Sequence, residues 1–308
     1  MTIEIYLASP RGFCAGVERA ISIVETAIDK FGAPIYVRHE IVHNKIVVDN
    51  LKAKGAIFVN EIDEIPKNSI IIFSAHGVSE EVELAAKNNN LKIFDATCPL
   101  VTKVHLEAQK HEKHGKKIIL IGHEGHPEVE GTSGRVKNDV TLISSVKDVD
   151  SLTFNKEDEL AYVTQTTLSV DDTSNIIKKL KERFPSIKGP DLKNICYATQ
   201  NRQTATKEMA EIVDLILVIG SKNSSNSNRL YDIAVDMNKK SYLIDSFKDI
   251  NLEWFEGIKK VGITAGASAP EQLVEQAINF IQSKFEIKLI TLKIIEEHTK
   301  FKLPKELS

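Results

Sequence analysis

Three cysteines are the residues in this chain with the clearest capacity for chemistry. Cys14, Cys98 and Cys196 each stand where an extended, strand-like run gives way to a helical pattern. A thiol at the start of a helix lies close to unpaired backbone N–H groups and to the positive end of the helix dipole. That environment favours the thiolate, which is the form that binds a metal or attacks an electrophile. Any one of these thiols could be a small buried hydrophobe, but three at similar turns favour a shared function.

The spacing of the cysteines narrows that function. There is no Cys-x-x-Cys pair of the kind that a structural zinc ribbon uses, and a disulfide would leave the third thiol without a role. Three thiolates from three similar turns suit a cubane iron–sulfur cluster in which one iron lacks a protein ligand. Two alternatives stay open, a non-enzymatic iron–sulfur sensor and a zinc hydrolase that acts on a phosphate ester. The sensor leaves the polar turns described next without a task.

Polar turns recur at matched distances from the cysteines. A first turn lies 29, 28 and 28 residues after the successive cysteines and contains His43, His126 and Ser224 in that order. A second turn lies 62, 68 and 72 residues after them and contains His76, Thr166 and Ser268. Short donors near helix N-termini are ready ligands for phosphate. Ordinary helix capping explains any single Ser, Thr or Asn, but the run that includes Ser225 and Asn226 holds more polar groups than one cap needs.

The ligand that these turns predict is a small phosphorylated substrate. Neither a P-loop pattern nor a Gly-x-Gly-x-x-Gly pattern is present, so a nucleotide cofactor is not indicated. Glu128 follows His126 closely and would face the same centre, where a carboxyl group can deliver protons. Spacing alone equally allows Glu128 to be a solvated acid in a turn. His105, His111 and His114 fall in a charged helical pattern and are expected to face water.

Strands that alternate with amphipathic helices must position these residues. Strand-like runs fall at 3–7, 35–37, 56–59, 69–73, 92–94, 117–121, 140–143, 160–163, 215–219, 241–244 and 260–263. Helical patterns fall at 17–31, 101–114, 174–184, 204–213, 229–237 and 270–284. Such alternation predicts α/β units with parallel sheets, whose ligand sites lie at the carboxyl ends of the strands. Three units around a pseudo-threefold axis would bring the cysteines together; three α/β domains in a row with separate sites are the alternative.

The composition indicates the class of protein and the compartment in which it works. The chain has 308 residues, 42% of them hydrophobic, with a formal net charge of −3. That charge gives no general attraction for nucleic acid or for an anionic membrane, and no apolar run is long enough to span a bilayer. The first residues lack the pattern of a signal peptide, and the low, odd cysteine count suits a reducing compartment. We therefore expect a cytoplasmic globular protein.

The motifs resemble those of one family. The matching segments are Pro10-Arg11-Gly12-Phe13-Cys14-Ala15-Gly16, Val42-His43-Asn44, Ser74-Ala75-His76-Gly77, Asp95-Ala96-Thr97-Cys98-Pro99, Gly125-His126-Pro127-Glu128, Thr164-Gln165-Thr166-Thr167-Leu168, Cys196-Tyr197-Ala198-Thr199-Gln200-Asn201-Arg202-Gln203, Ser221-Lys222-Asn223-Ser224-Ser225-Asn226 and Thr264-Ala265-Gly266-Ala267-Ser268. With these motifs the chain resembles the LytB/IspH family of 4-hydroxy-3-methylbut-2-enyl diphosphate reductases. About the last 25 residues carry no motif of that family.

The resemblance implies a fold and a division of the chain. The fold would be a trefoil of three pseudo-threefold-related α/β domains with parallel sheets around a central iron–sulfur cluster. Residues 1–14 would form a strand that joins the third domain, and residues 15–97, 98–195 and 196–284 would form the three domains. Residues 285–308 would form a C-terminal tail that covers the edge of a core.

The resemblance also implies roles. Cys14, Cys98 and Cys196 would hold one [4Fe–4S] cluster per chain, whose fourth iron, not ligated by protein, would take the hydroxyl oxygen of the substrate. The diphosphate would be bound by His43, His76, His126, Ser224, Ser225, Asn226 and Ser268, while Glu128 and Thr166 would serve the reacting end. The reaction would be the two-electron reductive dehydroxylation of the allylic diphosphate to isopentenyl and dimethylallyl diphosphates. This is the last step of the methylerythritol phosphate pathway, with a ferredoxin or flavodoxin as electron donor.

Overall fold

The chain folds into three parallel β-sheets with helices packed against them. The computed structural model describes residues 2–308, and every pair of hydrogen-bonded strands in its sheets is parallel. This confirms the predicted α/β class, and all eleven strands expected from the sequence are present. No helix within residues 2–308 is long and apolar enough to cross a membrane.

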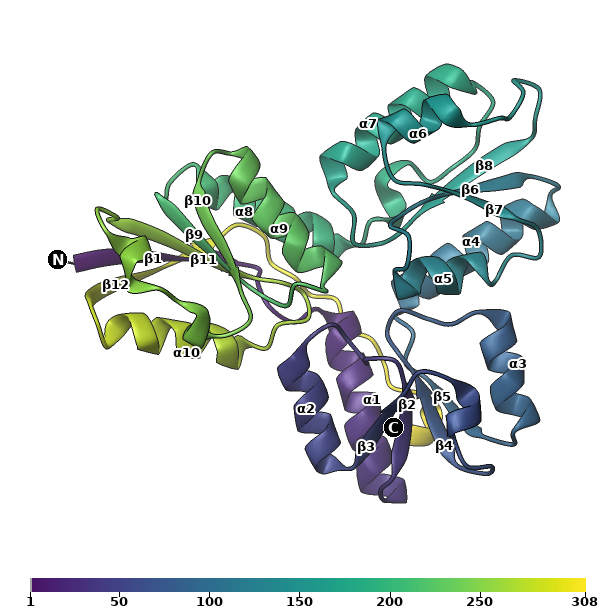
Figure 1. Cartoon of the computed structure of the whole chain (residues 1–308), viewed down its shortest axis with the longest axis horizontal. Coiled ribbons are helices and arrows are strands. Elements are labelled where there is room, and N and C mark those ends of the chain that lie inside the picture. The colour runs from purple at the N-terminus through teal and green to yellow at the C-terminus, as the bar shows by residue number, and fades with distance from the viewer. Residues whose placement is uncertain (1) are drawn as a thin grey trace. The chain divides into compact units, whose positions relative to one another are not determined.

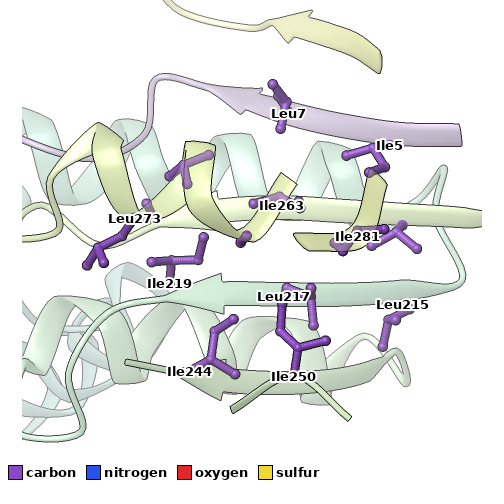
Figure 2. Packing of buried hydrophobic residues seen from close by; sticks show 14 of the residues in the cluster. Ile5, Leu7, Leu215, Leu217, Ile219, Ile244, Ile250, Ile263, Leu273 and Ile281 are labelled. Atoms are coloured by element: carbon purple, nitrogen blue, oxygen red, sulfur yellow. The ribbon is translucent and has the colours of Figure 1, made fainter. Parts of the chain in front are cut away.

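The largest sheet has five strands in the order β10-β9-β11-β1-β12. These strands are β1 (Thr2–Ser9), β9 (Leu215–Ile219), β10 (Lys240–Ile244), β11 (Lys260–Ala265) and β12 (Glu286–Lys293). Helices α8 (Tyr197–Ala210) and α9 (Ser225–Asp236) cover one face, and α10 (Glu271–Gln282) covers the other (Figure 1). Figure 2 shows side chains on alternate positions of β1 and β9, such as Ile5 and Leu217, which belong to one buried cluster with Leu273 of α10. Because successive side chains of a strand point to opposite faces of the sheet, each strand contributes to two hydrophobic cores, one on each face.

The second sheet has four strands in the order β3-β2-β4-β5. They are β2 (Ile35–Arg38), β3 (Ala56–Val59), β4 (Ile70–Phe73) and β5 (Lys92–Asp95). Helices α1 (Ala15–Phe31) and α2 (Lys45–Lys54) lie on one side of this sheet and α3 (Glu80–Asn88) lies on the other (Figure 1). Ile71 and Phe73 of β4 are buried in the core on the α3 side.

The third sheet has three strands in the order β7-β6-β8. They are β6 (Lys117–Ile121), β7 (Val140–Ile143) and β8 (Leu160–Thr164). Helices α4 (Pro99–Lys113) and α5 (Pro127–Ser133) pack on one face, and α6 (Val146–Ser151) and α7 (Val170–Arg183) pack on the other (Figure 1). The polar turns therefore follow the carboxyl ends of strands in every sheet, at β2 and β4, at β6 and β8, and at β9 and β11.

By the density of its contacts the chain divides into two compact units. Unit 1 comprises the chain up to Ala15 together with His43–Val47 and Tyr197–Lys300, and unit 2 comprises Gly16–Val42, Val48–Cys196 and Phe301–Ser308. The five-stranded sheet belongs to unit 1, and the other two sheets belong to unit 2. The three domain ranges stated above stay a prediction.

The expectation that His105 faces water is wrong. Only 5% of His105 is exposed, and it lies on the same face of α4 as the buried Val101, Val104 and Ala108. Residues three, four and seven positions apart share a helix face, so the apolar periodicity of this helix already included position 105. His114 is exposed, as expected, whereas His111 is half-buried beside Glu107.

Two further details of the chain differ from the sequence reading. The lead-in to Cys196 is not a strand but the short 3₁₀ helix η2 (Asp191–Asn194), and only an isolated bridge joins Lys188 to Ala161. Pro185 and Pro190 flank that bridge, and since proline has no N–H to donate, they limit the length of a strand at this place. In the C-terminal tail, alternating residues form β12, which pairs with β1 along its whole length and ends the sheet.

Candidate functional site

The three cysteines share one local geometry. Each is half-buried, none forms a disulfide, and the next residue is the first of helix α1, α4 or α8. The backbone N–H of each cysteine donates to a carbonyl of a polar turn: Cys14 to Ala267 (3.3 Å), Cys98 to Ala75 (3.0 Å) and Cys196 to Thr166 (3.0 Å). The hydrogen bonds therefore follow the repeat that the sequence predicts. Each cysteine binds the second polar turn of its own repeat, which carries Ser268, His76 or Thr166 respectively.

Unit 1 brings together five of the predicted substrate ligands. Ser224 is the N-cap of α9, and its Oγ accepts hydrogen bonds from the N–H (3.3 Å) and the hydroxyl (3.1 Å) of Ser227. Ser225 and Asn226 form the first turn of that helix, and Asn226 Oδ1 accepts from the N–H of Ala267 (2.8 Å). The helix N-terminus thereby meets the turn after β11, at a place where backbone N–H groups favour an anion.

Ser268 and His43 complete this group. Ser268 Oγ donates to the backbone carbonyl of His43 (3.0 Å) and lies 3.5 Å from Ser224 Oγ. The close approach requires glycine at position 266, because a Cβ there would lie 2.0 Å from Ser227 Oγ. The serine hydroxyls, the Asn226 amide and the backbone of His43 thus lie together within one unit, and none of these side chains carries a fixed negative charge that would repel a phosphate.

Unit 2 brings together the other four predicted residues. His126 is the N-cap of α5, and its Nδ1 accepts from the N–H of Glu128 (3.1 Å). In the neutral ring the proton is therefore on Nε2, which makes that nitrogen a donor. The ring of His76 lies edge-on to the ring of His126, with 5.8 Å between centroids, and His76 Nδ1 is 3.3 Å from Ser74 Oγ.

Glu128 is buried, not solvated. Only 2% of the residue is exposed, and its carboxyl group lies against Thr166. Oε1 accepts from the backbone N–H of Thr166 (2.6 Å), and Oε2 accepts from its hydroxyl (2.9 Å). Burial raises the pKa of Glu128 to about 7, although the two hydrogen bonds from Thr166 act to lower it. A carboxyl group with such a pKa holds a proton near neutral pH and can release it.

Two arginines close to the cysteines were missed from the sequence. Arg202 is completely buried and donates to the carbonyls of Gly12 and Phe13, and Arg19 donates to the carbonyl of Thr97. The signal for Arg202 was present, because it lies within a motif that begins at Cys196. Nothing in the sequence pattern distinguished Arg19 from other charged residues of its helix.

The donor set fits an iron–sulfur cluster better than a single metal ion. No three His, Cys, Asp or Glu side chains of residues 2–308 gather as ligands of one ion. The part of the chain that the structure describes therefore gives the zinc hydrolase alternative no support. A cubane cluster needs one thiolate for each bound iron, so its three thiolates come from separate positions. Three half-buried thiols at helix N-termini match that requirement.

Known proteins resemble the whole chain. The model of the family described as LytB protein matches residues 5–282. A 4-hydroxy-3-methylbut-2-enyl diphosphate reductase of Actinobacillus pleuropneumoniae serotype 3 (strain JL03) is 56% identical over 308 residues, which are 99% of this chain and 98% of the relative. The Wolbachia pipientis wMel enzyme of the same name is 54% identical over 98% of this chain and 99% of its own.

A solved structure agrees with these matches. The structure of E-1-hydroxy-2-methyl-but-2-enyl-4-diphosphate reductase from Plasmodium falciparum superposes with a TM-score of 0.96 at 41% identity, covering 100% of this chain and 97% of that one. Family model, relatives and structure all extend over the cysteines, the polar turns and the buried glutamate. The chain belongs to the LytB protein family.

Proposed function

We propose that this chain is a 4-hydroxy-3-methylbut-2-enyl diphosphate reductase, which converts its allylic substrate to isopentenyl and dimethylallyl diphosphates. In this reaction the C–O bond to the hydroxyl group breaks, two electrons and two protons are taken up, and water leaves. Relatives over half identical along almost the whole chain support the assignment. The observation in the structure that carries it is Glu128, a fully buried carboxyl group with a pKa of about 7.

The cofactor of the proposed reaction is one [4Fe–4S] cluster, with Cys14, Cys98 and Cys196 as its protein ligands. Their helix N-termini and their matched N–H hydrogen bonds support these assignments. With only three thiolates, one iron of such a cluster would lack a protein ligand. When bound, the cluster would supply two kinds of chemistry that no side chain offers, transfer of electrons and an open iron as Lewis acid for the leaving oxygen.

The diphosphate of the substrate is the ligand proposed for the polar turns. His43, Ser224, Ser225, Asn226 and Ser268 of unit 1 would contribute hydroxyl, amide and imidazole donors. His126 would donate from Nε2, the nitrogen that its Nδ1 hydrogen bond leaves protonated, and His76 stands against it. Hydrogen bonds of this kind to a phosphate are charge-assisted and thus roughly twice as strong as neutral ones.

Glu128 is proposed to deliver the proton that the leaving hydroxyl needs. Hydroxide is a poor leaving group, so its departure requires protonation. Thr166 holds both carboxyl oxygens of Glu128, one from its backbone N–H and one from its hydroxyl. That pair of contacts fixes the orientation of the acid, while burial raises its pKa to about 7, so that a large share of the carboxyl groups carries a proton at neutral pH.

A carrier protein is the proposed source of the two electrons, since the chain has no motif for binding a nucleotide reductant. We propose a ferredoxin or flavodoxin as that partner, and the cytoplasm as the compartment where both meet. Three cysteines that form no disulfide suit a reducing compartment.

Anaerobic turnover tests the proposal. The purified chain, loaded with iron and sulfide and supplied with a low-potential reductant, should convert the allylic diphosphate to the two isoprenoid diphosphates, detected by mass spectrometry. A brown protein with iron–sulfur absorption that binds the substrate without converting it would instead be a sensor. A colourless, zinc-containing protein would contradict the cofactor as well.

A further inference from the structure

In unit 1 the side chain of Arg202 binds the backbone carbonyls of the two residues just before Cys14. The side chain of Arg202 is 1% exposed. Its Nε and Nη2 both donate to the carbonyl of Gly12, at 3.0 and 2.8 Å, and Nη2 also donates to the carbonyl of Phe13 at 3.2 Å. Gly12 and Phe13 are the two residues that precede Cys14, so the guanidinium group fixes the direction from which the chain enters the cysteine.

The charge of Arg202 is balanced by the C-terminal segment. Glu297 lies beyond β12, and its carboxylate accepts from Arg202 Nη1 at 3.0 Å and Nη2 at 3.3 Å. Asn201 also donates to Glu297, at 3.0 Å. A buried guanidinium group needs acceptors for all five of its N–H groups, and here two carbonyls of the Cys14 turn, the carbonyl of Ala198 and Glu297 supply them.

Arg19 repeats the arrangement before Cys98 in unit 2. Its Nη1 donates to the carbonyl of Thr97 at 3.1 Å, and its Nη2 donates to the carbonyl of Asp95 at 3.4 Å. Thr97 directly precedes Cys98. The Nε of Arg19 donates to the carbonyl of Lys302 at 2.9 Å, so this arginine too has a partner in the C-terminal segment. Two arginines on different helices thus make the same pair of contacts, one with a cysteine turn and one with the tail.

The approach to Cys196 is held differently. The side-chain carbonyl of Asn194 accepts from the N–H of Thr164 at 3.1 Å, and its amide donates to Glu107 at 2.8 Å. At this turn a neutral side chain of the lead-in itself, two residues before the cysteine, contacts β8 and α4, and no contact of Arg202 or Arg19 with the residues directly before Cys196 is involved. Cys196 therefore offers an internal reference within the same chain.

We propose that Arg202 and Arg19 are positioning residues for Cys14 and Cys98, and that the segment 294–308 orders them through Glu297 and the Lys302 carbonyl. The proposal rests on the function proposed above, since it takes these cysteines as cluster ligands. It gives the tail, which carries no motif of the family, a specific task at two of the three ligands. Side chains that orient metal ligands typically change metal affinity by 10- to 100-fold when they are replaced.

The test compares variants of the full-length chain that affect one cysteine each. Arg202→Lys and Glu297→Gln should loosen the Cys14 turn, and Arg19→Lys should loosen the Cys98 turn. Arg183→Lys is the matched control, because Arg183 also donates to two backbone carbonyls, of Val149 and Leu152, but neither residue precedes a cysteine. Circular dichroism and thermal unfolding establish that each variant folds.

Two rates are measured. The first is alkylation of each cysteine by iodoacetamide in the chain before cluster loading, followed by peptide mass spectrometry. The second is release of iron from the loaded protein to a ferrous chelator. We expect Cys14 to react about tenfold faster in Arg202→Lys and Glu297→Gln, Cys98 to react about tenfold faster in Arg19→Lys, and iron to leave about tenfold faster in all three. Cys196 should react at the wild-type rate in Glu297→Gln and Arg19→Lys, which leave the hydrogen bond from Arg202 to Ala198 in place.

A general loss of stability would raise the alkylation rates of all three cysteines together and would also raise them in Arg183→Lys. Either that result or unchanged alkylation rates in folded variants overturns the proposal. If Arg202→Lys fails to fold, the Glu297→Gln and Arg19→Lys variants decide. The alkylation rates do not depend on a cluster, whereas the iron and sulfide content of the wild-type chain tests the proposed function. The two can therefore fail separately.

Discussion

Glu128 and Thr166 form a hydrogen-bonded pair in which Thr166 orients the carboxyl group of Glu128. The carboxyl group is surrounded by protein, and both of its oxygens accept hydrogen bonds from Thr166. Those hydrogen bonds favour the carboxylate, but the cost of burying a charge is larger, so the net pKa rises to about 7. An acid in this state is protonated for much of the time at neutral pH and yet can lose its proton during a reaction.

Replacement of Glu128 by Gln should separate proton delivery from binding. The amide keeps the size of the side chain and can still accept from the N–H of Thr166, but it cannot deliver a proton. We expect iron–sulfur content and substrate affinity near wild type, with turnover lower by at least ~10²-fold. Anaerobic single-turnover assays and a substrate titration of the cluster spectrum provide the measurements. A variant that turns over at nearly the wild-type rate would show that another group supplies the proton.

The same residue should make stability depend on pH. The pKa of Glu128 is raised from its ordinary value of 4.5 to about 7, so between these values the unfolded chain releases a proton that the folded chain keeps. The unfolding free energy of the wild type should fall as pH rises through this window, by up to ~3 kcal/mol relative to Glu128→Gln, and the difference should level off above about 7. Urea unfolding of both proteins from pH 4 to 8 measures it. A difference that is independent of pH would mean that the folded acid titrates like an exposed one.

At the scale of elements, the turn after β4 depends on a histidine behind it. Gly77 has a φ of +82°, and a Cβ at this position would lie 2.6 Å from Cε1 of His105. Burial lowers the pKa of His105 to about 4, so the ring is neutral and packs as an uncharged group beneath the turn that carries His76. Contact with the His105 ring thereby helps to set the distance between that turn and α4.

Gly77→Ala should destabilise unit 2 through two effects. The left-handed backbone conformation costs about 1–2 kcal/mol for a residue with a Cβ, and the contact with His105 adds to it. Gly125→Ala is the control, since Gly125 has a φ of +74° but no atom within 4 Å of its Cβ position. We expect Gly77→Ala to lower the unfolding free energy more than Gly125→Ala does.

A double-mutant cycle isolates the contact. Gly77→Ala combined with His105→Ala should be less destabilised than the sum of the single variants by ~1 kcal/mol, because the side chain that meets the new Cβ is gone. Urea unfolding of the four proteins gives the coupling energy. Strict additivity would show that the turn relaxes away from His105 at no cost.

The elements that the sequence predicted best are those with one strong periodicity. The β9 strand at 215–219 is a continuous apolar run that is buried on both faces, as parallel strands in α/β folds are. The pattern over β12 is weaker, because its exposed positions are interspersed with half-buried ones at the edge of a sheet. Edge strands bury little, so their composition resembles that of a solvated tail. Arg202 was missed as a structural residue because its partners, Gly12 and Glu297, are distant in sequence.

At the scale of the whole molecule, the repeat links three sheets that differ in size. Sheets of five, four and three strands each send one polar turn to accept a hydrogen bond from a cysteine. The contact is the same in all three sheets although the number of strands differs. It therefore depends on the carboxyl ends of the strands, where ligand sites of α/β folds lie, and not on the size of the sheet. Cys14 belongs to unit 1, whereas Cys98 and Cys196 belong to unit 2.

Replacement of any one cysteine by serine should therefore abolish the function to the same extent. Serine is a strong N-cap residue, so the helix that follows each cysteine should still begin normally and the folded chain should keep its thermal stability before cluster loading. What is lost is a thiolate ligand, and no further cysteine exists in the chain to replace it. Iron and sulfide analysis, the visible spectrum and anaerobic turnover are measured on Cys14→Ser, Cys98→Ser and Cys196→Ser. If the Cys14 variant alone kept its iron, sulfide and activity, the cluster would need only ligands from unit 2, and the role proposed for Cys14 would have to be abandoned.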